Sequence, residues 1–590
     1  MSDIPYRFQY DYPPEQLDSR TTYADFFPPL GQFGGPGQPW PLAYGVAPLD
    51  FGAYRDRDLL LVAEPVDPES GPTLGLFAPL GDLSHPEGGE WGWKGGKVVI
   101  YPAATVGRST SNDDTPAAIY VHGGLPASPN FASSLFDGVD PLTRSRPTVG
   151  EIEILDPSGE LDWLLDYVWD GARLSLKRGR RGTNFSTWET VARFTTSGLV
   201  PALDAKRFAL RDLGWQLQGP LHGEHYKGTG GLEGDAGQAG RWKPWALGWC
   251  FNAEPVLLSA ADQVFQWSLG SSQSLLAFKH GGVVLPVHAD YPTYEALAAA
   301  SIPSGHVGTC LAHSLARPNI TLQYGIRVDV IGDADIAYGH PGPTTRAAIA
   351  RRIATARGVN RLDDTADIDM TGFNRLEIRH AAPVGWYFGE EISKADALDL
   401  VMAGILGWWR IRPDGLLTVG FVESPSIGSS LSIAYREEGM GEPRVVAIGA
   451  PRAGTAMSWR TNNTPQDRDE LAPSVDDATA EILSQESRWA TAASPAVATL
   501  WPTARTAFVA NSGFWNEADA ALEAARQQGI LDVPRKRWQW PMKVDPYADL
   551  LGSVATLTGF DRLAAGAALP LLAIGIDAQG ADEVIFDWWG

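Results

Sequence analysis

The stretch VGEIEILDPSGELDWLLDYVWDGARLSLK, residues 149–177, decides the fold class of this chain. Residues 149–155 alternate apolar and polar side chains, as a strand with one buried face does. The sequence DPSG at 156–159 is typical of a turn. A short helical turn is expected at 161–168, and residues 172–177 alternate again. The stretch therefore predicts strands joined by tight turns.

The same pattern continues beyond this stretch. Residues 190–196 and 206–213 also alternate, and turn signals recur every ~8–12 residues across 148–226, a spacing typical of barrels and sandwiches. Strand-sized apolar runs return after residue 431. We therefore predict a fold that is mainly β with α+β insertions, in which the two β-rich regions form two related barrels.

Two helices are predicted between these β-rich regions. The first is PTTRAAIARRIATAR at 343–357, with Thr344 or Thr345 as the N-cap and Gly358 at its end. The second begins after the cap residue Ser393 and runs to about residue 406. These helices indicate an α+β region rather than a continuation of the β-structure.

A hairpin and a later helix follow. The sequence GWWRIRPDGLLTVGFV at 407–422 predicts two strands that turn at Pro413, Asp414 and Gly415. Residues 514–528 predict a helix, and Gly529 is expected to stop it. The region from 431 onward is thus expected to combine strands with a helical insertion.

The length of the chain requires several modules. At 590 residues it exceeds one hydrophobic core, and a prior of ~150 residues per domain suggests roughly four. The changes of pattern divide it into a β- and loop-rich region, a first tube-like barrel, a mixed insertion, an α+β domain and a second tube-like barrel with a helical insertion, at 1–140, 141–226, 227–335, 336–430 and 431–590.

The charge of the chain argues against nucleic-acid binding. The formal net charge is −23, and an acidic chain does not attract phosphate. The acidity favours solubility, and it also suits a wall along a path that DNA travels without sticking.

Cys250 and Cys310 are too few for a disulfide framework and are expected to be reduced and structural. No signal peptide or transmembrane segment is expected.

Three candidate binding motifs lack the residues that their chemistry needs. The Gly-rich loop at 228–240 carries Glu233 and Asp235, has no P-loop lysine and precedes no helix, so a surface loop is favoured over a nucleotide site. Zinc needs about four ligands. Neither H-x-x-H nor H-x3-C-x2-H supplies four, so packing in or near a core is favoured for His222 and His225 and for His306, Cys310 and His313.

No catalytic residue is predicted. The chain contains no G-x-S-x-G nucleophile motif, and the adjacent pairs Glu390–Glu391 and Glu437–Glu438 point apart in a helix or a strand. The aromatic pairs Trp408–Trp409 and Trp588–Trp589 are candidates for stacking on sugars, but core or interface positions are favoured for them. The sequence therefore predicts no enzyme, no cofactor and no metal ion.

Five stretches of the sequence form an ordered set of motifs. They are 136–171, 226–258 with Lys243, Pro244, Gly248, Phe251, Asn252 and Pro255, 395–422, WRTNNTPQ at 459–466 and LGSVATLT at 551–558. Taken together, they resemble the tail-hub proteins of long-tailed bacteriophages and prophages, which are related to contractile-tail baseplate hubs and gene-transfer-agent hubs, and their order is more specific than any single match. Ser553 departs from the family pattern, which has an acidic residue there, and the first 135 residues match poorly.

The resemblance implies a structural role at the tail tip of a virion. Hubs of this group are trimers in which each chain carries two tube-like barrels, so three chains present a pseudo-sixfold ring. Such a ring joins the hexameric tail tube or distal tail ring to the trimeric tip and fibres, near the tape measure protein, and it surrounds the DNA exit channel. Acidic or neutral side chains are then expected to line the channel. The alternatives are a tail-associated glycan hydrolase or a glycan-binding receptor protein.

Overall fold

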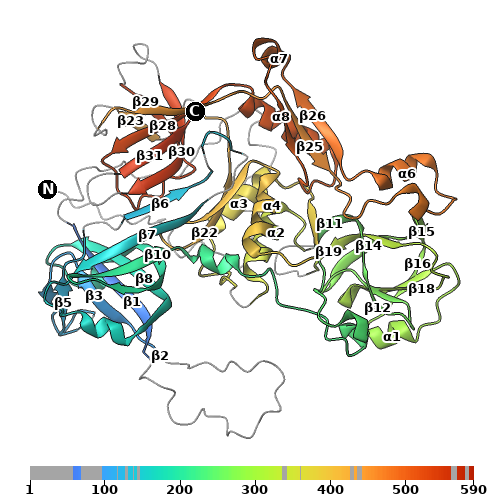
Figure 1. Ribbon diagram of the computed structural model, residues 1–590, viewed down its shortest axis with the longest axis horizontal. Coiled ribbons are helices and arrows are strands. Elements are labelled where there is room, and N and C mark those ends of the chain that lie inside the picture. The colour runs from blue at the N-terminus through green and yellow to red at the C-terminus, as the bar shows by residue number, and fades with distance from the viewer. Residues whose placement is uncertain are drawn as a thin grey trace, which may run out of the picture. The chain divides into compact units, whose positions relative to one another are not determined.

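The structure is a computed structural model, and it is mainly β, as the sequence predicts (Figure 1). It places the strands in several sheets with helices between them. No helix within the described part of the chain is long and apolar enough to span a bilayer. The structure describes residues 57–67, 96–115, 117–126, 130–136, 138–141, 146–334, 342–358, 361–425, 431–434, 441–559, 568–578 and 584–590.

The largest sheet draws its strands from both ends of the described chain. Its order is β24-β28-β31-β30-β6-β7-β10-β9-β8-β1-β3-β5-β4, with β2 beside β1 and with β29 between β23 and β30. The strands are β1 Arg57–Asp67, β2 Gly96–Lys97, β3 Ile100–Ala104, β4 Arg108–Ser109, β5 Tyr120–Gly123, β6 Asn130–Ser134, β7 Arg146–Leu155, β8 Val168–Arg180, β9 Glu189–Pro201, β10 Ala205–Arg211, β23 Leu431–Ala434, β24 Arg444–Gly449, β28 Arg535–Met542, β29 Val554–Thr558, β30 Leu569–Ala578 and β31 Val584–Trp589.

The predicted alternation around residues 149–177 is confirmed. Ile152 and Ile154 of β7 are fully buried, whereas Glu151 and Leu155 are exposed. The expected helical turn is the 3-10 helix η3, Asp162–Asp166. Strands β8, β9 and β10 follow as antiparallel neighbours. Local pattern therefore determined this part of the sheet.

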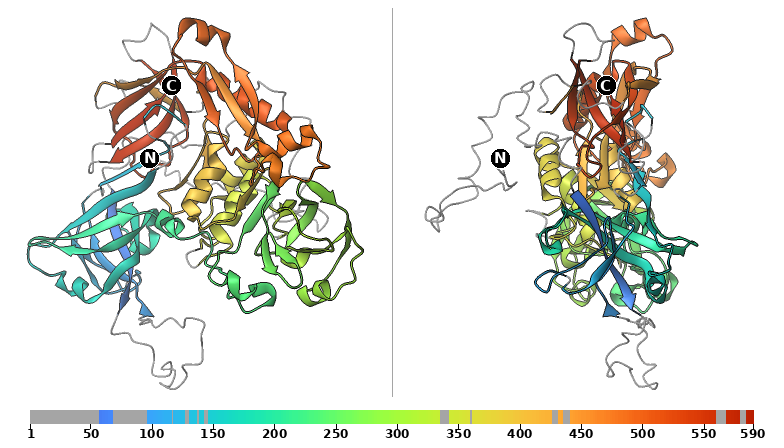
Figure 2. Two further views of the ribbon diagram at one scale, coloured as in Figure 1. Left: turned by 45° about the vertical axis from the view of Figure 1, so that its right-hand side comes forward. Right: turned by 90° about the vertical axis from the view of Figure 1, so that its left-hand side faces the viewer.

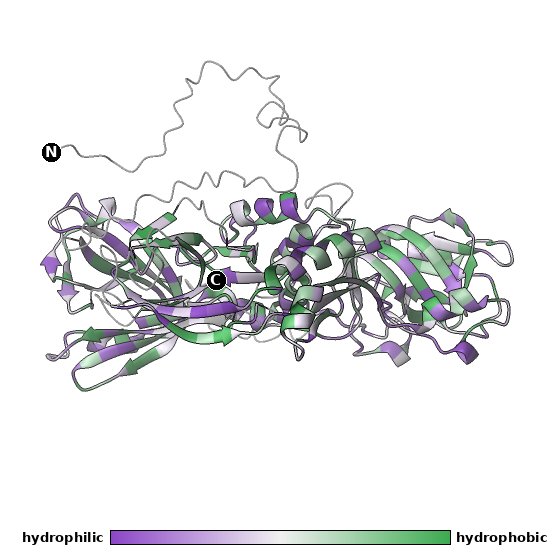
Figure 3. Cartoon of the chain, turned by 90° about the horizontal axis from the view of Figure 1, so that it is seen from above, coloured by the Kyte–Doolittle hydropathy of each residue, from purple (hydrophilic) through white to green (hydrophobic). Residues whose placement is uncertain are grey.

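Strand β6 joins the two β-rich regions. It pairs antiparallel with β7 on one side and with β30 on the other, where Phe131 lies opposite Ala578 and Ser134 opposite Gly575. Figures 1 and 2 show β6 between the C-terminal strands and the N-terminal strands. One hydrophobic core runs beneath both sets, with Ile152 and Phe586 among its buried members. Hydrophobic and hydrophilic residues are interspersed along the strands, as Figure 3 shows.

Two further sheets of five strands form the middle of the chain. One has the order β15-β14-β19-β11-β20, and the other has the order β12-β13-β18-β17-β16. Their strands are β11 Trp245–Ala253, β12 Val256–Ser259, β13 Val264–Gln266, β14 Ser272–His280, β15 Val283–Leu285, β16 Val287–Asp290, β17 Val307–Cys310, β18 Leu315–Pro318, β19 Ile326–Gly332 and β20 Gly385–Phe388, and helix α1 spans Tyr294–Ala298.

The predicted helices and hairpin of the α+β region are present. They are α2 Arg346–Thr355, α4 Lys394–Ala403, and the paired strands β21 Gly407–Ile411 and β22 Leu417–Phe421. Thr345 and Ser393 cap the two helices by accepting hydrogen bonds from the N–H groups of Ala348 and Asp396. Helix α3, Met370–Arg379, was not predicted.

A three-stranded sheet under helix α8 follows. Its strands are β25 Gly454–Trp459, β26 Arg488–Ala493 and β27 Thr506–Val509, and its helices are α6 Asp477–Ser484, α7 Pro495–Leu500 and α8 Glu517–Leu531. The prediction that Gly529 ends the last helix is wrong, because α8 continues through it to Leu531. Gly529 is exposed and nothing lies within 4 Å of the position of its missing Cβ, so it fits the helix without strain.

The other helical elements within the described residues are short 3-10 helices. They connect strands and shape loops, including the Gly-rich loop. They are η4 Phe185–Thr187, η5 Leu213–Gln218, η6 Gly231–Glu233, η7 Ala236–Gln238, η8 Leu311–His313 and η10 Arg468–Glu470.

Candidate functional site

Two of the family-like motifs meet in the structure although they lie 210 residues apart. The buried Asn252, from the motif at the end of β11, donates a hydrogen bond of 2.9 Å from Nδ2 to Oδ1 of Asn462 and one of 2.8 Å to the carbonyl of Thr464. Asn462 donates in turn to the carbonyls of Leu483 and Gln485. We call this contact the Asn252–Asn462 seam, and it holds β11 against the segment that follows β25.

A group of cations surrounds one carboxylate beside this seam. Lys279 on β14 lies 2.6 Å from Asp329 on β19, and Asp329 also accepts a hydrogen bond from the Asn252 N–H. Arg460 and Arg488 lie nearby. Burial lowers the pKa of each of the three cations, and repulsion between Arg460 and Arg488 lowers the pKa of Arg488 further.

The two arginines of this group lie against aromatic rings. The Arg488 guanidinium lies 4.6 Å from the Trp459 ring centroid, and that of Arg460 lies 4.6 Å from the ring of Trp515. Cation–π contacts of this kind attract a charge that has lost its water. Sequence reasoning missed these cations, because nothing in a linear pattern signals that β14, β19 and β26 bring their charges together.

The Gly-rich loop is held to the neighbouring motif by an ion pair. Lys243 Nζ lies 2.8 Å from Glu233 Oε1, and the Lys227 N–H donates to the other oxygen of Glu233. Burial would raise the pKa of Glu233, but these hydrogen bonds outweigh it and lower the pKa. Strand β11 rather than a helix follows the loop. The Glu233 side chain is half-buried in this pair, whereas Asp235 is exposed.

The first histidine pair is split between core and surface. His222 is buried and stacks on Trp242, with 3.6 Å between the ring centroids, and burial lowers its pKa to about 3. His225 is exposed. Such a histidine stays neutral at physiological pH and acts as an aromatic core side chain.

The second cluster does not share one helical face. Cys310 ends β17, and His313 ends the 3-10 helix η8. Within the described residues no group of three or more His, Cys, Asp and Glu side chains is placed to hold a metal ion. Cys250 and Cys310 are both buried free thiols, as expected.

The aromatic pairs lie where the sequence analysis placed them, mostly in the core. Trp588 and Trp589 are buried in the core beneath the large sheet, where Trp408 packs with partial exposure, and Trp409 is buried in a separate core cluster. Glu390 and Glu391 are exposed. The pair Glu437–Glu438 lies outside the described residues.

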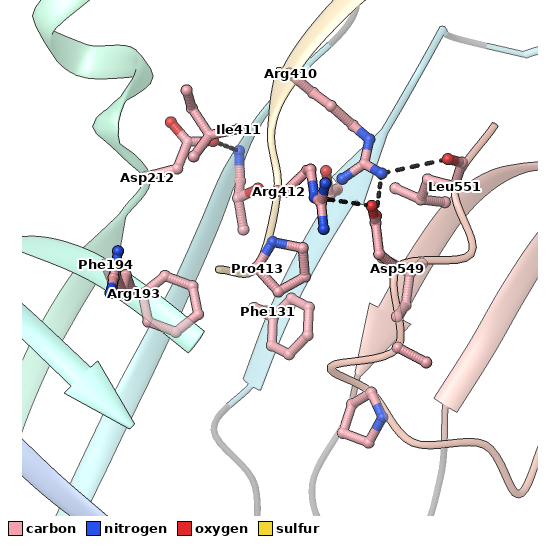
Figure 4. A pocket seen from close by; sticks show the side chains of 15 residues that line it. Phe131, Arg193, Phe194, Asp212, Arg410, Ile411, Arg412, Pro413, Asp549 and Leu551 are labelled. Carbon is pink, nitrogen blue, oxygen red and sulfur yellow. Dashed lines mark hydrogen bonds and ion pairs between the residues drawn. The ribbon is translucent and has the colours of Figure 1, made fainter. Parts of the chain in front are cut away.

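A small cavity where the hairpin meets the large sheet contains a network of ion pairs (Figure 4). Arg410 and Arg412 of the hairpin both bind Asp549, which precedes β29, and the Pro413 carbonyl accepts a hydrogen bond of 2.7 Å from the N–H of Arg193 on β9. Burial would lower the pKa of Arg412, but its carboxylate neighbours raise it.

This cavity is a packed junction between the hairpin and the large sheet rather than a ligand pocket. Its volume is about 20 Å³, which accommodates about one water molecule. A neighbouring surface hollow of about 240 Å³ includes Glu189, Asp414 and Asp549. Each of these carboxylates pairs with an arginine.

The chain matches no family model, and no curated protein sequence matches it. Among solved structures it is similar to a 43 kDa tail protein of prophage MuSo2 from Shewanella oneidensis, at 9% identity and a TM-score of 0.29, covering 80% of this chain and 95% of that one. Prophage tail protein gp18 from Listeria monocytogenes EGD-e gives 8% identity, a TM-score of 0.26 and coverage of 79% and 89%. A chain of the virion of a native gene transfer agent shows 14% identity and a TM-score of 0.16, and the match covers 48% of this chain and 82% of that one.

Proposed function

We propose that this chain is a structural, non-enzymatic protein of a bacteriophage tail tip. In this proposal it forms a homotrimeric hub that joins the hexameric tail tube or distal tail ring to the trimeric tip and fibres and surrounds the DNA exit channel. Its ordered family-like motifs support this role.

The observation that carries the proposal is the joint made by β6. A hub that presents six similar faces from three chains needs two related β-units in each chain, held at a fixed relation. The pairing of β6 with both β7 and β30 joins the strands of 57–211 to β23, β24 and β28–β31 in one hydrogen-bonded sheet, whereas β25–β27 form a sheet of their own. The modules between them, 227–335 and 336–430, are then peripheral insertions.

The buried contacts favour a structural role over chemistry. The Asn252–Asn462 seam and the Arg410–Asp549 contact both join segments far apart in the sequence. Polar networks of this kind, when their groups are satisfied, fix one arrangement of packed parts. A hub must keep its modules in register while large partners attach, so rigid joints suit it.

Mass measurement and cryo-electron microscopy of the purified chain test the proposal. We expect a particle of three times the 63.6 kDa chain mass, with a threefold axis and an axial channel. We also expect two superposable β-barrels in each subunit, one from the N-terminal strands and one from the C-terminal strands. A monomer at micromolar concentration, or a ring without threefold symmetry, would contradict the hub.

The same maps test the channel. Because the chain carries a net charge of −23, three copies carry three times that charge, and an acidic wall repels DNA over the Debye length of ~8 Å. A basic lining would instead bind phosphates and slow exit. We therefore expect fewer Lys and Arg than Asp and Glu among the channel-facing side chains, and an excess of cations would refute the expectation even if the trimer forms.

A further inference from the structure

Strand β24 is an edge strand with exposed apolar side chains. Among the described strands it is the last of the large sheet, pairing with β28 on one side and with no strand on the other. Val445, Val446 and Ile448 are 41%, 43% and 66% exposed. An open edge of this kind is a template on which another extended chain pairs.

The strand leads directly into a cavity of about 400 Å³. Ile448 and Gly449 form one border, and Trp501, Val533 and Trp589 supply apolar walls. The walls are fixed to one another: the Arg452 N–H donates to the Leu531 carbonyl at 2.7 Å. This volume lies within the range of ~300–1,000 Å³ found for binding pockets, and it fits one or two large side chains.

The cavity is positively charged although the chain is strongly acidic. Arg452, Arg505 and Arg535 line it, whereas Asp140 is the one carboxylate among the described lining residues and pairs with Arg452 at 2.7 Å. Arg535 lies over the Trp589 ring at 4.9 Å. Arg505 is exposed and has no carboxylate partner within the described part of the chain. The cavity therefore has an excess of cations.

We propose that β24 and this cavity bind an extended, acidic segment of a partner protein. The segment adds as a strand to β24, places an apolar side chain against Trp501 and Val533, and sets a carboxylate beside Arg505. Strand addition supplies main-chain hydrogen bonds, and the pocket supplies specificity for alternate side chains. The inference does not depend on the hub proposal, because the edge, the cavity and the arginines all belong to one chain.

Fluorescence polarisation with two labelled octapeptides tests this inference on the full chain. One peptide alternates valine with glutamate and the other alternates valine with lysine. The net negative charge of the protein repels the glutamate peptide and attracts the lysine peptide. Tighter binding of the glutamate peptide therefore requires a positively charged site. We expect the glutamate peptide to bind at least about tenfold more tightly, a difference of ~1.4 kcal/mol, and to protect the β24 amides from hydrogen exchange.

Variants distinguish the site from the rest of the surface. Arg505→Glu should reduce affinity for the glutamate peptide by about tenfold or more, and Ile448→Ser should weaken it as well. Both side chains are exposed, so folding is preserved. Arg361→Glu, an exposed arginine outside the cavity, is the matched control and should change nothing.

Three results would overturn the proposal. The first is equal or tighter binding of the lysine peptide, and the second is an Arg505→Glu affinity that equals that of Arg361→Glu. The third is a change in oligomer mass in Arg505→Glu and Ile448→Ser with no peptide binding to the wild type, because a second copy of the chain then occupies the strand edge. The hub proposal is tested by a separate measurement of the trimer mass, so none of these results decides it.

Discussion

Replacement of Asn462 by alanine should loosen the Asn252–Asn462 seam. The Asn462 side chain is buried and takes part in four hydrogen bonds: it accepts from Asn252 at 2.9 Å and from the Thr464 N–H at 3.2 Å, and it donates to the carbonyls of Leu483 at 2.8 Å and Gln485 at 3.1 Å. The alanine variant removes all four and leaves buried partner groups without them.

The magnitude follows from these bonds. A hydrogen bond contributes about 0.5–1.5 kcal/mol net, and a buried partner left unsatisfied costs more. Allowing for water reaching some of the freed groups, we expect the seam to lose about 3 kcal/mol, or about a hundredfold in its opening equilibrium. The neighbouring Asn463 is exposed and makes one side-chain bond, of 2.8 Å, to the Phe251 carbonyl, so Asn463→Ala should lose at most about 1 kcal/mol.

Hydrogen exchange followed by mass spectrometry measures this effect locally, which matters because a chain of several modules need not unfold in two states. Peptides over 459–486 and 245–253 should lose protection in Asn462→Ala, while peptides over helix α2 should keep theirs. Equal protection in the two variants would refute the reasoning. A loss that extends equally to α2 would also refute it, because the network would then stabilise the whole chain rather than the seam.

Two further predictions concern single residues. Gly529→Ala should stabilise the chain by about 0.5–1 kcal/mol in denaturant unfolding, because the site is helical, exposed and open, whereas Gly513→Ala should destabilise it, since Gly513 has φ +80° and its Cβ would meet Trp386 at 2.2 Å. Burial and nearby arginines lower the pKa of His380 to about 2, and they outweigh Glu523 at 3.9 Å. Because the unfolded state takes up this proton below pH ~6.5, stability falls as the pH falls; His380→Leu should reduce that loss by about 2 kcal/mol at pH ~5, and an unchanged pH dependence would contradict the assignment.

Local features of the fold were predictable because their determinants lie within a few residues. The alternation at 149–155, the caps Thr345 and Ser393, and the turn at 413–415 each depend on neighbours in the sequence. Helix α3 was not predicted from the sequence, and it contains Gly372, a residue of low helix propensity. In the fold, this glycine allows close approach, since a Cβ there would lie 2.5 Å from Thr418 Oγ1. The prediction that a helix ends at Gly529 was wrong. Nothing lies within 4 Å of the position of its missing Cβ, and the helix continues through it.

The long-range features were not predictable from local pattern. The pairing of β6 with β30 joins residues more than 400 positions apart, and the arginines of the β24 cavity come from separate segments between 452 and 535. Charge and hydropathy along the chain do not encode which segments meet. The resemblance to tail hubs supplied motifs but no contacts, so it could not indicate the seam.

The seam explains why a motif without chemistry can be specific. Asn252 has φ +53° and is fully buried, and its side chain reaches the Asn462 amide and the Thr464 carbonyl of the other motif. Asparagine tolerates this left-handed backbone and supplies both a donor and an acceptor, a combination that an apolar residue of similar size lacks. A buried amide is costly unless it is paired, so the two asparagines require each other. Their joint presence therefore indicates a required junction between modules, and it needs no active site to account for it.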